Sequence, residues 1–217
     1  SRGLGDVYKR QAQECIQKWR VLYDKNGDNH YDTISAFIKS MRGSDPDAAV
    51  YYLAKMLYAG EKVAFIARRI MICASEDVGN ADPQALTVAV SAAQAVERIG
   101  MPEAQIILSQ AATYVACAPK SNSACNAIFA ANEEVRRSGN LPIPAHLQDA
   151  HYKGAAKLGH GTGYKYAHDY PNHYVEQQYL PYELTGKKYY EPSWNGYEAK
   201  IREHMKRIKD EAKQKED

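Results

Sequence analysis

The chain has 217 residues, of which 45% are apolar and 25% are charged, and its formal net charge is +2. This composition excludes a disordered chain, and the small net charge gives no overall electrostatic case for nucleic-acid binding. No apolar run approaches the roughly 18 residues that a membrane-spanning helix needs, so we expect no membrane association. Four scattered cysteines without a CxxC pair predict reduced thiols in a cytoplasmic protein.

The first part of the chain gives little structural signal. Residues 1–11, SRGLGDVYKRQ, show neither a helical nor a strand period and lack the apolar segment of a secretory signal. We interpret them as a cloning remnant or a sequence artefact. Residues 24–35 faintly resemble a calcium loop, but the glycine is misplaced and Ser35 stands where glutamate is needed. We therefore favour a turn that leads into a helix after Asp32.

The apolar period is helical almost throughout residues 32 to 138. The segment 34–41 places four apolar residues on one face, at i, i+3, i+4 and i+7. Ser44 or Asp45 can cap the start of the next helix, and Asp82 can cap a later one. The predicted helices lie within the stretches 34–41, 42–60, 61–79, 82–100, 101–119 and 121–140.

These helices are short, rich in alanine and joined by two to five residues, which favours close, antiparallel or steeply crossed neighbours. In the stretch 61–79, a stripe that includes Ile66, Ile70 and Cys73 is predicted to be buried. Asp-Pro pairs begin helices at Asp45 and Asp82, 37 residues apart, which could indicate a helical repeat. Only two copies occur, so a compact all-α bundle is favoured over a solenoid.

The composition changes after Pro142. A loop is predicted to lead into one helix at roughly 145–157. Residues 159–192 then carry no helical period and are rich in glycine, proline and tyrosine, which predicts an irregular segment. Residues 193–217 end the sequence as a highly charged helix, whose interleaved signs are typical of a solvated face.

The segment GHGTGYKYAHDYPNHYVEQQYLP, residues 159–181, invites functional interpretations. Its glycines lack the G-x4-G-K-[ST] spacing that cradles phosphates, and no such motif occurs elsewhere in the chain. His160, His168 and His173, with Asp169, are spaced by eight and five residues with Pro171 between them, which is unlike the usual zinc spacings. We therefore expect no catalytic residue, no cofactor and no metal in this chain.

Glu76 and Asp77 are adjacent carboxylates near the end of a predicted helix, where negative charge is unfavourable. Adjacent side chains of a helix diverge, so an acid–base pair is not favoured. Arg68 and Arg69 are too far along the helix for both to compensate them. We predict an ion-pair network at helix ends, with partners on a neighbouring helix or subunit. Its candidate members are Arg42, Asp45, Arg68, Arg69, Glu76 and Asp77.

Ten of the seventeen tyrosines lie between residues 152 and 197. Tyrosine covers a large area while keeping a polar tip, which suits an interface or a segment that clamps a helical body. Tyrosines beside lysines can also stack on single-stranded bases. For the first alternative the candidate residues are Tyr166, His168, Asp169, Tyr170 and Tyr174. For the second they are Lys120, Lys153, Tyr164 and Lys165, with Tyr166.

Several stretches together resemble the C-terminal part of the RarA/MgsA family of AAA+ ATPases, relatives of the Werner-helicase-interacting protein. They are HYDTISAFIKSMRGSDPDAAVYYLAKMLYAGE, ARRIMICASEDVGNADPQAL, YVACAPKSNSA, GYKYAHDYPNHYVEQQYLP and YYEPSWNGYE, in collinear order. The resemblance covers roughly residues 12–208. It leaves out the first eleven residues and the charged tail.

The resemblance implies an oligomerisation domain like the collar of clamp loaders, assembling a tetramer. Residues 12–25 would be the end of the AAA+ lid, 26–158 the helical oligomerisation domain, 159–192 a tyrosine-rich strap packing on it, and 193–217 a C-terminal helix. The family acts in replication, recombination and repair at stalled forks, near the nucleoid, with DNA and single-strand-binding protein as partners. ATP and Mg²⁺ would belong to an ATPase module that this chain lacks, so we expect no catalysis by this chain alone.

Overall fold

The computed structural model describes residues 2–22, 28–151, 154 and 158–214, and in this part of the chain the regular elements are all helices. The predicted all-α class is confirmed. By its contacts the chain divides into two compact units, Ser1–Cys125 with Asn195–Tyr197, and Asn126–Trp194 with Glu198–Asp217. Among the described residues, no helix is both long and apolar enough to cross a membrane.

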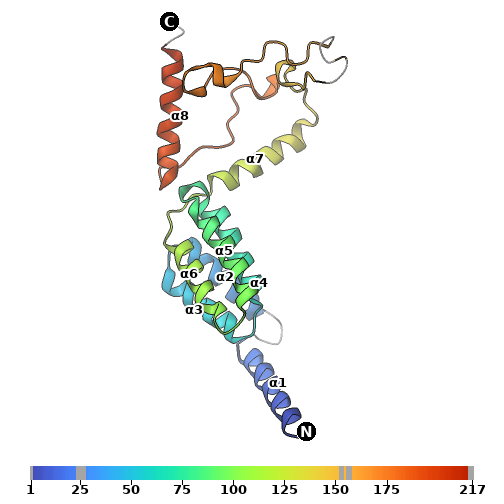
Figure 1. The fold of residues 1–217 in the computed structure, drawn as a ribbon, viewed down its shortest axis with the longest axis vertical. Coiled ribbons are helices and arrows are strands. Elements are labelled where there is room, and N and C mark those ends of the chain that lie inside the picture. The colour runs from blue at the N-terminus through green and yellow to red at the C-terminus, as the bar shows by residue number, and fades with distance from the viewer. Residues whose placement is uncertain (1, 23–27, 152–153, 155–157, 215–217) are drawn as a thin grey trace. The chain divides into compact units, whose positions relative to one another are not determined.

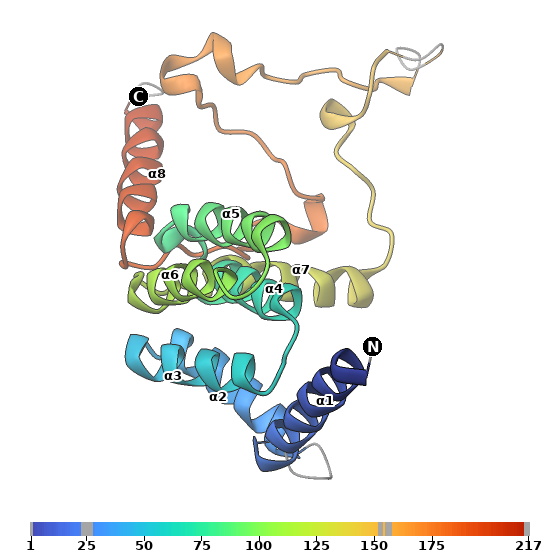
Figure 2. The same ribbon diagram turned by 60° about the horizontal axis from the view of Figure 1, so that its bottom comes forward.

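The described residues of the first unit contain six complete α-helices, α1 to α6, and the first turn of α7 (Figure 1). Helix α6 packs against α2, α3, α4 and α5, while α3 also packs on α2 and α5 on α4. Figure 2 shows α5 and α6 side by side. The bounds are α1 (Arg2–Leu22), α2 (Asp28–Arg42), α3 (Pro46–Tyr58), α4 (Val63–Cys73), α5 (Gln84–Ile99) and α6 (Ala104–Cys117).

Large apolar side chains and alanines share the core of this unit. Phe37 and Met41 of α2, Ile66 of α4 and Leu108 of α6 are fully buried. Alanines at the centres of α5 and α6 are buried as well, and their small side chains let the helix axes approach closely. The predicted apolar faces of segments 34–41 and 61–79 are therefore confirmed.

The predicted helix ends are largely confirmed by local chemistry. The Asp45 carboxylate accepts a hydrogen bond from the Ala48 N–H at 2.9 Å and caps α3. Asp82 accepts one from the Gln84 N–H at 3.0 Å, but the N-cap position of α5 is Pro83, so Asp82, the predicted cap, stands one residue before it. Gly100 follows α5 with a φ of 73°, in the left-handed region that glycine adopts most readily.

The end of α4 differs from the expectation of one helix up to Gly79. Regular α-helix stops at Cys73, a π-helical turn covers Ala74–Val78, and a 3₁₀ turn covers Gly79–Ala81. Such π turns within helices often accompany functional positions. Here the turn carries both Glu76 and Asp77.

Helix α1 corrects the expectation that residues 1–11 lack regular structure, because it begins at Arg2. Side chains 7–16 are exposed. Residues 7–16 bury no side chain, so burial imposes no apolar stripe on them that periodicity could detect. The interpretation of these residues as a remnant or artefact stays a prediction.

The second unit holds most of α7 (Ser123–Ser138) and of α8 (Tyr197–Lys213), joined by an irregular segment with short 3₁₀ turns (Figure 1). The predicted irregular segment and charged C-terminal helix are confirmed. The predicted helix at 145–157 is wrong for residues 145–151, which form one 3₁₀ turn, Ala145–Leu147, and then chain without regular secondary structure. There the side chains of Gln148 and Asp149 bond to nearby backbone groups and compete with helix formation. Residues 152–153 and 155–157 of that prediction lie outside the described residues.

Candidate functional site

Arg42, at the end of α2, lies against both carboxylates of the π-helical turn. Its Nε donates to Asp77 Oδ1 at 2.6 Å, and its guanidinium lies 3.6 Å from Glu76 Oε1. The hydrogen bond to Asp77 raises the pKa of Arg42 above its ordinary value. Arg42 of the neighbouring helix α2 thus supplies positive charge to both carboxylates.

Asp77 has a second partner inside the core. The Cys73 thiol, 1% exposed, lies 3.3 Å from Asp77 Oδ2 and donates to it. Burial, followed by the nearby Asp77 charge, raises the pKa of Cys73 to about 12. Cys73 therefore stays a neutral donor near neutral pH, and the buried Asp77 carboxylate is bonded through both oxygens.

Lys120 ties the end of α6 to the same region. Its ammonium donates to the carbonyls of Ala116 and Ala118, at 2.8 and 2.6 Å, and to the Ser44 hydroxyl at 3.1 Å. Burial lowers the pKa of Lys120. Three bonds engage all three donors of the ammonium, which leaves Lys120 no free donor for a DNA phosphate.

A short turn before α8 also reaches this region. The Asn195 side chain donates to the Lys120 carbonyl at 2.9 Å. Next to it, Gly196 has a φ of 53°, and a Cβ there would lie 2.1 Å from the Ala81 carbonyl oxygen and 2.7 Å from Pro119 Cγ. Only glycine fits so close to this backbone.

The remaining members of the predicted network, Asp45, Arg68 and Arg69, form no ion pair with Glu76 or Asp77 among the described residues. Asp45 serves as the cap of α3, and Arg68 is exposed. Arg69, Arg42 and Glu76 line a hollow of about 390 Å³ beside α2 and α4. The Arg69 Nε is buried there without a hydrogen-bond partner in the described residues.

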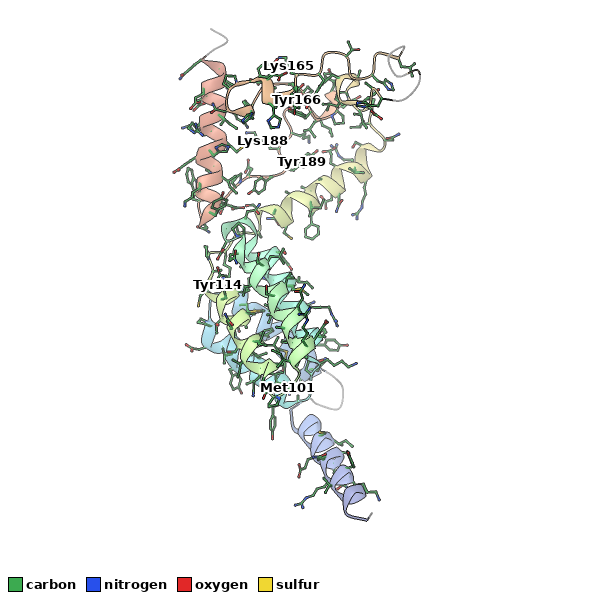
Figure 3. All side chains as sticks on the ribbon, viewed as in Figure 1. Met101, Tyr114, Lys165, Tyr166, Lys188 and Tyr189 are labelled. Carbon is green, nitrogen blue, oxygen red and sulfur yellow. The ribbon has the colours of Figure 1, made fainter. Side chains whose placement is uncertain are left out.

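A larger hollow, of about 950 Å³, lies between α3 and α6. We call it the α3/α6 groove. Its lining residues are Val50, Tyr51, Leu53, Ala54, Lys55, Leu57, Tyr58, Met101, Gln105, Ile106 and Ser109. Tyr51, Tyr58 and Ile106 are 64%, 57% and 69% exposed, although they are large and mostly apolar. Met101, which precedes α6 (Figure 3), is half exposed.

The predicted strap, residues 159–192, folds on itself and contacts neighbours within the second unit. The Lys165 backbone and the Gln177 side chain exchange two hydrogen bonds, at 3.2 and 2.8 Å. Lys187 Nζ lies 3.4 Å from Glu134 Oε2 of α7. Packing of this segment on the helical body stays a prediction.

The strap candidates lie around two successive 3₁₀ turns, Ala167–Asp169 and Pro171–His173. His168 and His173 are brought together, with their Nδ1 atoms 3.1 Å apart. The Tyr166 ring lies beside His168, at 5.1 Å between ring centroids. Tyr170 and the half-buried Tyr174 line a small hollow beside α8, and burial raises the pKa of Tyr174.

The DNA-contact candidates belong to different units of the chain. Lys120 is in the first unit, whereas Tyr164, Lys165 and Tyr166 are in the second. Figure 3 labels Lys165 and Tyr166. Lys153 lies outside the described residues. Tyr164 and Tyr166 are about half exposed, at 47% and 53%.

Several structural residues were not predicted from the sequence. Glu198 is fully buried and accepts from the Tyr190 hydroxyl at 3.0 Å and the Ser193 N–H at 2.8 Å. Tyr114, labelled in Figure 3, donates to Asp82 at 2.8 Å. Only Gly196 carried a usable signal, since an Asn-Gly pair marks a turn.

Comparisons with known proteins match nearly the whole chain. Residues 43–209 match the family profile described as MgsA AAA+ ATPase C terminal, and residues 2–42 match one described as AAA C-terminal domain. An uncharacterized AAA domain-containing protein of Mycobacterium tuberculosis is 52% identical over 210 residues, covering 96% of this chain and 46% of that protein.

Two further relatives carry the name replication-associated recombination protein A. The one from Bacillus subtilis is 50% identical over 185 residues, covering 85% of this chain and 44% of that protein. The one from Haemophilus influenzae is 41% identical over 202 residues, covering 93% of this chain and 45% of that protein. The chain thus spans less than half the length of these relatives.

Proposed function

This chain belongs to the RarA/MgsA family of AAA+ ATPases, and on that premise we propose that it is the domain through which such an ATPase assembles into oligomers. Four subunits are the expected number. The observation that carries the proposal is the α3/α6 groove, which leaves large apolar side chains in water. Exposed apolar patches of this kind mark protein–protein contacts.

The composition of the groove supports a protein partner. Tyrosine and methionine are enriched in protein interfaces and charged residues are depleted at their centres. Lys55 is the one charged residue among those that line the groove. Its ammonium is 3.4 Å from the Asn29 side-chain oxygen, so part of its charge is already engaged within the subunit.

A second copy of the chain is the occupant that we propose. Closed homo-oligomers commonly use a self-complementary patch, and a groove rimmed by protruding tyrosines can accept the same rim from another copy. Tyr51 on α3 and Ile106 on α6 provide such protruding side chains on the two sides of the groove.

The test is the mass of the chain in solution by light scattering after gel filtration. We expect an oligomer for the wild type and a monomer for Ile106→Asp, because a buried carboxylate without a partner opposes association. Val135→Asp is the matched control, since Val135 is 66% exposed on α7 and outside the groove. A wild-type monomer at tens of micromolar would refute the proposal. So would an Ile106→Asp variant of unchanged mass.

DNA binding is a second candidate, favoured by the exposed Tyr164 and Tyr166 on either side of Lys165. Tyrosines can stack on single-stranded bases while a lysine contacts phosphate. We expect Lys165→Ala and Tyr166→Ala to weaken binding to single-stranded or forked DNA in low salt. Lys200→Ala, at an exposed lysine of α8, should not. Absence of binding by the wild type would remove this candidate.

For the whole protein we propose the roles that the family resemblance implies. ATP hydrolysis with Mg²⁺, stimulated by DNA, would occur in an ATPase module, and this chain would hold such modules together at replication forks. Association with single-strand-binding protein belongs to the same proposal. The test is to introduce Ile106→Asp into the whole protein and to measure DNA-stimulated ATP hydrolysis. A loss of hydrolysis together with the loss of assembly would show that assembly and hydrolysis are coupled.

A further inference from the structure

Two histidines of the strap face each other through the same ring nitrogen. His168 Nδ1 and His173 Nδ1 are 3.1 Å apart, with ring centroids at 4.8 Å and planes inclined by 56°. Both side chains are exposed, so the pair is open to solvent.

The backbone around this pair is unusual. Asn172 and His173 have φ angles of 56° and 51°, in the left-handed region that side-chain-bearing residues seldom adopt. Such conformations cost on the order of 1 kcal/mol or more each and tend to cluster at ligand-binding positions. The Asn172 side chain donates a hydrogen bond to Glu211 of α8, which anchors the turn to that helix. The turn therefore presents His173 toward His168 at an energetic cost.

The nitrogen separation suits two ligands of one metal ion. With zinc–nitrogen distances of about 2.0–2.1 Å, two nitrogens 3.1 Å apart subtend an angle of about 100° at the metal, close to the tetrahedral angle. Neutral imidazole is also the commonest metal ligand among side chains.

We propose that His168 and His173 bind a divalent transition-metal ion, such as Zn²⁺, through their two Nδ1 atoms. Among the described residues no third histidine, cysteine or carboxylate joins them in a group, so water completes the coordination. Imidazole ligands select zinc, copper or nickel over magnesium and calcium, which prefer oxygen. This site is separate from the α3/α6 groove and does not depend on oligomerisation.

By sequence alone, the spacings of these histidines do not match a helical or thiolate metal site, which argues against a metal. The two 3₁₀ turns remove that objection, because they fold the five-residue spacing back on itself. A bound metal would clip Ala167–Asp169 to Pro171–His173. Since Asn172 is bonded to Glu211, the clip would also hold this corner of the strap on α8.

The experiment is a Zn²⁺ titration of the whole chain by calorimetry, repeated for His168→Ala and His173→Ala. We expect saturable binding of one ion and a loss of affinity of more than about tenfold in each variant. His160→Ala is the matched control, because it removes a histidine of the same segment outside the pair, and its affinity should match the wild type. Circular dichroism checks that each variant keeps the wild-type fold.

A second readout identifies the ligands. Electron paramagnetic resonance of the Cu²⁺-loaded chain should show two coordinating nitrogens, and each variant should show fewer. The alternative is a simple Nδ1–H···Nδ1 hydrogen bond with no metal affinity. The proposal is overturned if the wild type shows no saturable binding. It is equally overturned if both alanine variants bind as the wild type does, or if the His160→Ala variant loses as much affinity as they do.

Discussion

The side-chain amide of Asn195 donates a hydrogen bond to the backbone carbonyl of Lys120, 75 residues earlier in the chain, at 2.9 Å. The same Lys120 bonds through its ammonium to the end of α6 and to Ser44. The contact thus fixes the turn before α8 to the loop that follows α6. Gly196 allows this approach because it presents no side chain to Ala81 and Pro119.

Gly196→Ala should release this turn. The added methyl would collide with the Ala81 carbonyl, and the φ of 53° is itself strained for alanine. We expect a loss of about 3 kcal/mol in the free energy of unfolding, from backbone strain of roughly 1–2 kcal/mol and overpacking of a similar size. Urea denaturation measures the loss, and limited proteolysis should cut the variant near residue 196.

Gly186→Ala separates the two causes. Gly186 has a φ of 80°, but a Cβ there would meet no atom within 4 Å. Its substitution should cost only the backbone strain, about 1 kcal/mol. Equal losses in the two variants would contradict the steric role of Gly196.

Arg42→Ala should destabilise the first unit because it removes a charged partner of the nearly buried Asp77. We expect a loss of about 2 kcal/mol, less than for a fully buried pair, since the Arg42 side chain is 45% exposed. Arg68→Ala, at an exposed position of α4, should change stability by less than about 0.5 kcal/mol. Thermal melting of both variants tests the prediction, and similar melting temperatures would refute it.

Asp45→Ala should cost about 1 kcal/mol because α3 loses the acceptor for the Ala48 N–H. Asp45→Asn keeps a capping oxygen and should lower the free energy of unfolding by only a few tenths of a kcal/mol. Urea denaturation of the two variants distinguishes capping from charge, since both lose the charge and only one loses the cap. If both variants lose the same stability, capping is not the role of Asp45.

Cys73 should resist alkylation at pH 8, while the exposed Cys117 reacts. Mass spectrometry after iodoacetamide treatment measures this directly.

The stability contribution of the Cys73 thiol should depend on pH. The pKa of Cys73 is raised to about 12 in the folded chain, whereas in the unfolded chain the thiol loses its proton from pH about 8.5 upward. The stabilising contribution of the thiol is therefore complete below pH 8.5 and is lost as the pH rises toward 12. The stability difference between wild type and Cys73→Ala should narrow over that range, and a constant difference would contradict the buried, neutral thiol.

Periodicity and capping chemistry were sufficient to predict most of the first unit. The buried stripe Ile66, Ile70 and Cys73 continues at the same spacing to Asp77, so the burial of Asp77 could have been read from the sequence too. Periodicity failed for α1, whose side chains 7–16 are exposed, and for residues 145–151, where polar side chains satisfy the backbone locally.

By itself the sequence determined the family, the all-α class, the helix ends at Asp45 and Gly100, and the irregular strap, because these depend on local pattern. Only the tertiary structure decided which distant groups meet. It set Arg42 against Asp77, Asn195 against Lys120, and His168 against His173. Even the last pair, five residues apart, depends on two consecutive left-handed residues that no apolar pattern encodes. Contacts of this kind follow from how helices and turns pack, and linear spacing does not specify that packing.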